Sequence, residues 1–105
     1  MVETHEYYLE KYGIGWHLLG NNINLCVDIN YVEFHKMINH TSFLHRLDGP
    51  AIICRPPQEP AEWHINGYEI TSKIQQWGDT QNIDLDNLTE MDKVLIKLTW
   101  GDYDG

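Results

Sequence analysis

The sequence predicts an α+β fold in which short antiparallel strands over residues 14–70 precede two helices, at about 72–78 and 89–99. Three observations support this class. Apolar and polar residues alternate in the N-terminal half, turns rich in Gly and Asn separate the apolar segments, and capping residues with helical periodicity follow in the C-terminal third. Because 105 residues with 42% hydrophobic content are enough for one core, we expect a single domain over residues 1–105.

The N-terminal segment is predicted to contain one short element followed by a hairpin. Residues 7–12 fit either one turn of an amphipathic helix or an edge strand. The GNN sequence at residues 20–22 separates two apolar segments, as in a β-hairpin, and the alternation over residues 23–29 has the period of a half-buried strand. YVEFHKMI at residues 31–38 contains aromatic and β-branched side chains, which favour a strand.

Two turns are predicted in the middle of the chain. Asp48-Gly49-Pro50 fits a turn because Asp accepts hydrogen bonds from following amides, Gly adopts positive φ and Pro does not continue a helix. The apolar AIICR segment that follows is expected to be a short strand. Asn66-Gly67 is the dipeptide best suited to a type I′ hairpin turn, in which both central residues have positive φ.

Two helices are expected after this hairpin. Thr71 is the predicted N-cap of the first, which should end near Gly78. Thr89 is expected to cap the second together with Asp92, in a capping box where Asp replaces the usual Glu or Gln. Apolar side chains at helical spacing are expected to form one face of the second helix: Leu88, Met91, Val94, Leu95 and Leu98.

The charge balance and the N-terminus bear on partners and location. Seven basic and 16 acidic residues give a formal net charge of −9. Since grooves that bind phosphates need clustered Lys and Arg, we expect no direct binding of nucleic acid.

The sequence has neither a long apolar run nor the basic and apolar regions of a signal peptide, so we expect no membrane association and a cytoplasmic location. Cys26 and Cys54 are expected to remain reduced.

The central segment resembles a known repeat. HRLDGPA at residues 45–51 and EWHINGYEIT at residues 62–71 are similar to the MORN-like repeats, of the form His-Arg-x-Asp-Gly-Pro-Ala … Trp-x-x-Asn-Gly, of small proteins encoded by tailed bacteriophages. The helical segment after the repeat resembles the segment that often follows the last such repeat. The resemblance implies an architecture, with the repeat at residues 45–67, and a bacteriophage source, but no particular activity.

The resemblance also implies structural roles for the basic residues of the repeat. His45 and Arg46 are expected to bridge to neighbouring strands or to the Trp63 ring. With one clear copy of the repeat, its core must be completed by the N-terminal strands and the C-terminal helices or by a second subunit. The sequence is therefore compatible both with a closed α+β domain and with a homodimer.

The histidines suggest two kinds of site, neither of which we favour. His35, His40 and His45 lie five residues apart, a spacing that no regular element directs at one ion, so we expect no metal site and no cofactor. His45, Asp48 and His64 could form the acid–base cluster of a small hydrolase or nuclease. In the repeat pattern, however, His45 and Asp48 are structural positions.

We therefore favour a non-enzymatic phage protein that binds a host or phage protein and inhibits or modulates it, in host takeover or counter-defence. An acidic mimic of nucleic acid and the small hydrolase are the alternatives. Trp100 in the polar tail fits either an interface anchor or a residue that folds back on the core. Folding explains the RPPQEP loop and the acidic, aromatic tail least, and the predicted partner-binding residues lie there: Arg55, Pro56, Pro57, Glu59, Asp84, Asp86, Trp100, Asp102 and Tyr103.

Overall fold

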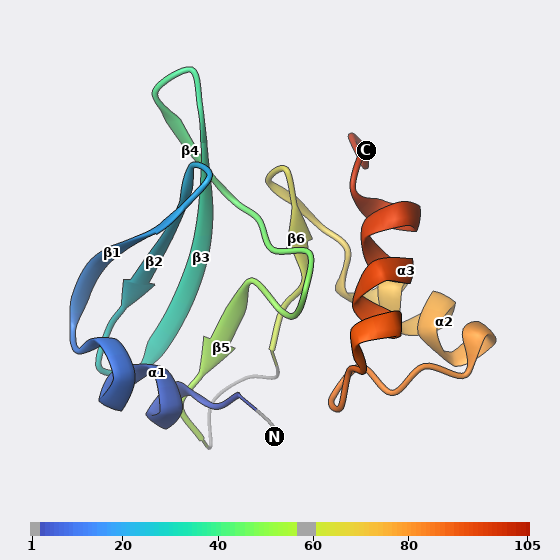
Figure 1. The fold of residues 1–105 in the computed structure, drawn as a ribbon, viewed down its shortest axis with the longest axis horizontal. Coiled ribbons are helices and arrows are strands. Elements are labelled where there is room, and N and C mark those ends of the chain that lie inside the picture. Colours follow the sequence, from blue (N-terminus) through green and yellow to red (C-terminus); the bar gives the residue numbers. More distant parts are fainter. Residues whose placement is uncertain (1–2, 57–60) are drawn as a thin grey trace.

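The computed structural model describes residues 3–56 and 61–105 and confirms the α+β class, with antiparallel strands followed by two C-terminal helices (Figure 1). None of the helices in these residues is long and apolar enough to cross a bilayer. In chain order the elements are α1 (His5–Tyr12), β1 (Gly15–Gly20), β2 (Ile23–Val27), β3 (Tyr31–Ile38), β4 (Thr41–Leu44), β5 (Ile52–Cys54), β6 (His64–Ile65), β7 (Tyr68–Glu69), α2 (Thr71–Gln81) and α3 (Glu90–Trp100).

The N-terminal element, which the sequence left open, is the helix α1. The Thr4 side chain caps it by accepting a hydrogen bond from the Tyr7 N–H at 3.2 Å. The helix buries His5 and Tyr8, three residues apart, and His5 Nε2 donates to the Asp28 carbonyl at 2.7 Å. A short helix is marginal alone, so this contact with the sheet helps to hold it in place.

The main sheet has the order β1-β2-β3-β4, and β5 pairs with the other half of β3. In the antiparallel register Leu25 lies opposite Phe34 and Val27 opposite Val32. Because alternate side chains point to one face, these four side chains meet Ile53 and the Tyr8 ring in the first core cluster. The expected strand at residues 31–38 is confirmed as the central strand β3.

Three hairpins of the fold turn on pairs of residues with positive φ, as type I′ turns require. The Asn66-Gly67 turn between β6 and β7 is confirmed, and so is the hairpin between β1 and β2. Asparagine adopts this conformation more readily than most residues, which explains its place in every turn. The φ pairs are 51° and 65° at Asn21-Asn22, 50° and 66° at Asn39-His40, and 51° and 87° at Asn66-Gly67.

The second core cluster joins the β6–β7 hairpin to the two C-terminal helices. Its buried members are Trp63, Ile65, Ile70, Ile74 and Ile96. In Figure 1, β5, a strand of the main sheet, and the β6–β7 hairpin lie on the side of the sheet that is nearer to the helix pair. The two clusters therefore follow each other along the long axis of the molecule, which measures 36 Å.

The predicted N-cap and the predicted end of α2 were wrong. Thr71 is the first helical residue rather than the N-cap, because its hydroxyl accepts from the Trp63 N–H at 3.0 Å and donates to Glu69 at 3.1 Å. The helix continues through Gly78 to a left-handed C-cap at Asn82, with φ of 59°. The Thr71 hydroxyl thus bonds to residues outside the helix instead of capping it. Gly78 is tolerated inside the helix.

The capping box of α3 is confirmed, but the predicted core face is wrong. The Thr89 hydroxyl accepts from the Asp92 N–H at 3.1 Å, and the Asp92 carboxylate accepts from the Thr89 N–H at 3.0 Å. The fully buried side chain of α3 is Ile96, and the Trp100 ring meets Trp77 edge to face at 6.1 Å. This aromatic contact fixes the rotation of the helix and turns four of the five apolar residues of the predicted face toward solvent.

Candidate functional site

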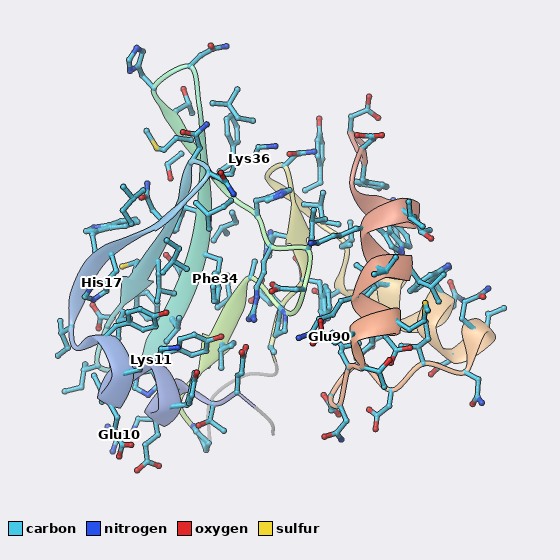
Figure 2. The ribbon with its side chains drawn as sticks, in the orientation of Figure 1. Glu10, Lys11, His17, Phe34, Lys36 and Glu90 are labelled. Carbon is cyan, nitrogen blue, oxygen red and sulfur yellow. The ribbon has the colours of Figure 1, made fainter. Side chains whose placement is uncertain are left out.

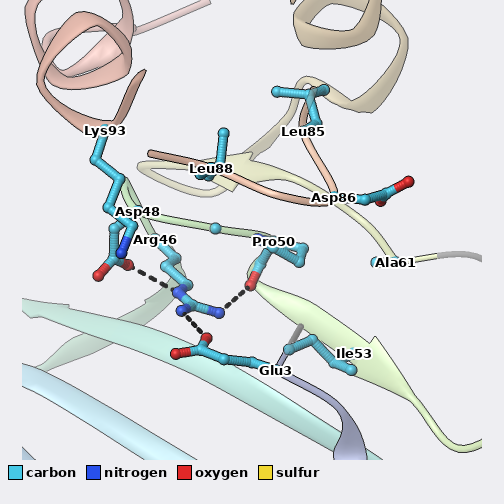
Figure 3. A pocket seen from close by; sticks show the side chains of 11 residues that line it. Glu3, Arg46, Asp48, Pro50, Ile53, Ala61, Leu85, Asp86, Leu88 and Lys93 are labelled. Atoms are coloured by element: carbon cyan, nitrogen blue, oxygen red, sulfur yellow. Dashed lines mark hydrogen bonds and ion pairs between the residues drawn. The ribbon is translucent and has the colours of Figure 1, made fainter. Parts of the chain in front are cut away.

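The Asp48-Gly49-Pro50 turn wraps around the buried side chain of Arg46, as Figure 3 shows. The guanidinium donates to Asp48 at 2.8 Å, to Glu3 at 2.5 Å and to the Pro50 carbonyl at 3.2 Å. A side chain at Gly49 would place its Cβ 2.7 Å from the Arg46 Cζ, so the guanidinium would have to move away from its present partners. We call Arg46, Glu3 and Asp48 the Arg46 cluster.

The aromatic partner of Arg46 differs from the expectation. The guanidinium lies 4.1 Å from the centre of the Phe34 ring, and not over Trp63, which belongs to the second core cluster. Phe34 extends from β3 toward the middle of the molecule (Figure 2). Arg46 therefore joins the N-terminal segment, the main sheet and the repeat turn.

Two carboxylates of the Arg46 cluster are held ionised. Burial alone would raise the pKa of Glu3, but hydrogen bonds from Tyr8 and Arg46 outweigh it and hold this pKa below its usual range. Burial likewise opposes ionisation of Asp48, and the Arg46 charge overcomes it and lowers the pKa of that carboxyl.

Two clefts flank the Arg46 cluster, with volumes of about 170 Å³ and 440 Å³. Lys93 lines the first cleft and Lys97 the second.

His45 is buried and uncharged. Its Nδ1 accepts from the Asn66 N–H at 2.9 Å, so the expected bridge from His45 to a neighbouring strand is present. Burial lowers the pKa of His45 to about 4, and the nearby positive charge of Lys36 adds to this effect. The imidazole therefore acts as a hydrogen-bond acceptor that holds the β6–β7 turn.

This lowered pKa predicts a stability that falls with acidity. Between pH 6.5 and about 4 the unfolded chain binds a proton at His45 that the folded chain excludes, so stability is lost as the pH falls through this window. From pH 7 to pH 5 the loss is about 2 kcal/mol. His45→Asn keeps an acceptor for Asn66 and removes the titration. Urea unfolding at both pH values should show a smaller loss for the variant, and equal losses would contradict the assignment.

A second cluster surrounds His64 on the β6–β7 hairpin. Glu62, His64 and Glu69 each place a ligand atom within 4.8 Å of the others, because His64 lies opposite Glu69 and Glu62 precedes it by two residues. The sequence analysis considered His35, His40 and His45 as metal ligands and missed this group, because it considered His64 only as a catalytic base. It could hold a divalent cation, but His64 Nε2 lies 3.0 Å from Glu62, and Nδ1 has no hydrogen-bond partner among the described residues. Ligating imidazoles normally have such support on the second nitrogen.

The three residues of the hydrolase alternative belong to separate sets of contacts. His45 bonds the Asn66 backbone, Asp48 pairs with Arg46, and His64 lies against Glu62. No hydrogen bond joins any two of His45, Asp48 and His64, all of which are described. Each of the three side chains is thus engaged in a different structural contact.

The predicted partner-binding residues fall into three groups. Arg55 and Pro56 are exposed after β5, whereas Pro57 and Glu59 lie outside the described residues. The exposed carboxylates lie at both ends of α3, with Asp84 and Asp86 before it and Asp102 after it. Trp100 and Tyr103 pack against the second core cluster, which is the folded-back arrangement that the sequence had left open for Trp100.

An exposed apolar surface that the sequence reasoning missed lies on α3. We call it the α3 face, formed by Met91, Val94, Leu95 and Leu98, which are 66%, 48%, 38% and 78% exposed. The spacing i, i+3, i+4, i+7 places them on one side of the helix, and Glu90 lies at its start (Figure 2). The apolar periodicity of these four residues is visible in the sequence, but the sequence analysis assigned this face to the core.

Comparisons with known proteins add no further assignment. No family model, no curated protein and no solved structure matches this chain.

Proposed function

We propose that this chain acts by binding a protein through the α3 face, and that it modulates or inhibits that partner without catalysing a reaction. The observation that carries the proposal is the exposure of four large apolar side chains in one stripe, up to 78% for Leu98. Contiguous exposed apolar side chains rimmed by polar groups are typical of protein-binding surfaces. The i, i+3, i+4, i+7 spacing is the one with which helices dock into apolar grooves.

The charges around the α3 face favour a basic partner. Asp84, Asp86 and Glu90 lie before or at the start of the helix, and Asp102 and Asp104 lie beyond its end, all of them exposed. Lys93, which pairs with Glu90, and Lys97 lie within the helix, so the net negative charge is at its two ends. A second copy would bring carboxylates against carboxylates in a parallel or an antiparallel pairing, which is repulsive. A partner that presents apolar side chains flanked by Lys or Arg would meet opposite charges at both ends.

The source and setting of this interaction come from the sequence. The resemblance of HRLDGPA and WHING to the repeats of small phage proteins supports a bacteriophage source. We therefore propose that the partner is a host protein, bound in host takeover or counter-defence. The cytoplasm of the infected cell is the corresponding location.

The proposal predicts that Leu98→Glu weakens partner binding without unfolding the chain. Tagged wild-type protein would be used to capture a partner from bacterial lysate, and the purified pair would then be measured by calorimetry. Leu98→Glu should weaken binding tenfold or more, because a central apolar anchor of an interface is replaced by a charge. Since Leu98 is 78% exposed, the free energy of unfolding should change by only about 0.5 kcal/mol.

Ile29→Glu is the matched control, because Ile29 is 54% exposed in the turn before β3, away from the α3 face. It should leave the affinity within about twofold. Measuring the affinity at high salt distinguishes the proposed apolar interface from the nucleic-acid mimic. An apolar interface keeps its partner at high salt, whereas a mimic releases it. A purified partner that binds Leu98→Glu as tightly as wild type would contradict the proposal.

A further inference from the structure

The strand β1 forms an open edge of the main sheet. Among the described residues β1 pairs with β2 alone, in the register Trp16 opposite Cys26 and Leu18 opposite Asn24. Alternate backbone N–H and C=O groups of an edge strand point away from the sheet and are free to pair with another strand. In Figure 1, β1 lies at the end of the molecule opposite to α2 and α3.

The edge lacks the charges that usually protect such strands. Residues 12–27 contain no Asp, Glu, Lys or Arg, although 22% of the chain is charged. Proteins normally guard open edges with charged side chains, with proline or with a bulge. Here a bulge occurs only at the end of the strand, between Leu18 and Gly20, and the residues before it pair regularly with β2.

Apolar side chains line one face of the strand beside this edge. Trp16 and Leu18 are 62% and 76% exposed, and their spacing of two within β1 places them on the same face. Ile14, just before the strand, is 64% exposed. The Trp16 ring leans over the sheet to within 5.2 Å of the His35 ring, away from the open edge. The backbone of the edge is thus accessible, and an apolar surface adjoins it.

We propose that β1 is a self-association edge, at which two copies of this chain pair antiparallel about a two-fold axis at Trp16. In this register each Trp16 lies opposite the second copy's Trp16, and each Leu18 comes to the level of the second copy's Ile14, just before the strand. Opposite residues of an antiparallel pair project to the same face, so the Trp16 and Leu18 side chains of the two copies form one apolar surface. The two sheets become continuous, and both open edges are covered.

The charge distribution selects a second copy as the occupant. Each chain carries a net charge of −9, so two copies repel each other wherever acidic surfaces meet. The β1 edge belongs to the uncharged segment at residues 12–27, where this repulsion is weakest. A basic partner would gain no ion pair there, unlike at the α3 face. The dimer leaves the α3 face of each copy accessible at the far ends of the assembly.

The experiment measures the mass of the intact chain in solution by analytical ultracentrifugation over a range of concentrations. Wild type should reach twice the chain mass of 12.3 kDa, and higher salt should strengthen the dimer by screening the net charge. Leu18→Lys and Trp16→Lys should both remain at 12.3 kDa, because each places like charges beside the two-fold axis. Ile29→Lys, the same kind of change at an exposed site off the edge, should still form the dimer.

Hydrogen exchange provides a second measurement that does not depend on a variant. The outward amides of residues 15–18 should become protected as the wild-type concentration rises, with no such change in Leu18→Lys. A chain that stays at 12.3 kDa at every concentration would overturn the inference, and so would a dimer that Leu18→Lys and Trp16→Lys leave intact. Protection of these amides only after another protein is added would assign the edge to a foreign strand instead.

Discussion

Replacing Arg46 with methionine is expected to lower the free energy of unfolding by about 2–4 kcal/mol. Arg46 is 7% exposed, and its loss would leave the carboxylates of Glu3 and Asp48 without their counter-charge. Both carboxylates are partly exposed, at 39% and 52%, so water compensates them in part and the expected loss is below that of a fully buried pair. The contact with the Phe34 ring and the bond to the Pro50 carbonyl are lost as well.

Arg55→Met is the matched control, because Arg55 is the other arginine of the chain and is exposed. Its substitution should change the free energy of unfolding by no more than about 0.5 kcal/mol. Urea unfolding at pH 7 would compare the two variants with wild type, and the midpoint of Arg46→Met should fall while that of Arg55→Met stays. If both variants unfolded with wild type, the Arg46 cluster would contribute little to stability.

The elements that could be predicted are those with local causes. The Asn66-Gly67 turn depends on the φ preference of two adjacent residues, and the Thr89–Asp92 capping box on bonds that span three residues. In these two cases the sequence pattern is sufficient. Asp48-Gly49-Pro50 is also a bend, but the predicted reasons were wrong: Gly49 is not among the residues with positive φ, and the Asp48 carboxylate binds Arg46 instead of a following amide.

The sequence predicted that Arg46 bridges neighbouring segments, but not which residues it contacts. The resemblance to MORN-like repeats implied a bridging role, but Glu3 lies 43 residues before Arg46 in the chain. No sequence rule relates the two positions, and the aromatic ring beside the guanidinium is that of Phe34 instead of Trp63. The helix α1 was undecided for a similar reason, since its docking includes the bond from His5 to Asp28, 23 residues away.

The rotation of α3 is the error with the greatest consequence for function. The helix carries two apolar patterns, the four residues of the α3 face and the pair Ile96 and Trp100, which are four residues apart. Periodicity favours the larger set, but packing against α2 selects the smaller one through the contact of Trp100 with Trp77. A hydrophobic stripe in a sequence therefore indicates that a face will be covered, and either the core or another protein can cover it.

The two patterns of α3 predict opposite results for two similar truncations. Ile96→Ala should lower the free energy of unfolding by about 2–4 kcal/mol, because Ile96 is 0% exposed and its loss leaves a cavity among Ile70, Ile74 and Trp63. Leu98→Ala should change it by no more than about 0.5 kcal/mol, because this side chain is 78% exposed. Both substitutions place alanine in the same helix, so the helix propensity of the new residue is the same.

Urea unfolding of the two variants separates the two orientations of α3. If the face predicted from periodicity were the buried one, Leu98→Ala would be the more destabilising change, and the present orientation would be wrong. Partner binding should show the reverse order, with Leu98→Ala weakening the complex and Ile96→Ala affecting it only through the folded fraction. Because Ile96 supports the helix and Leu98 faces outward, a single pair of alanine variants distinguishes the contribution of α3 to stability from its proposed contribution to binding.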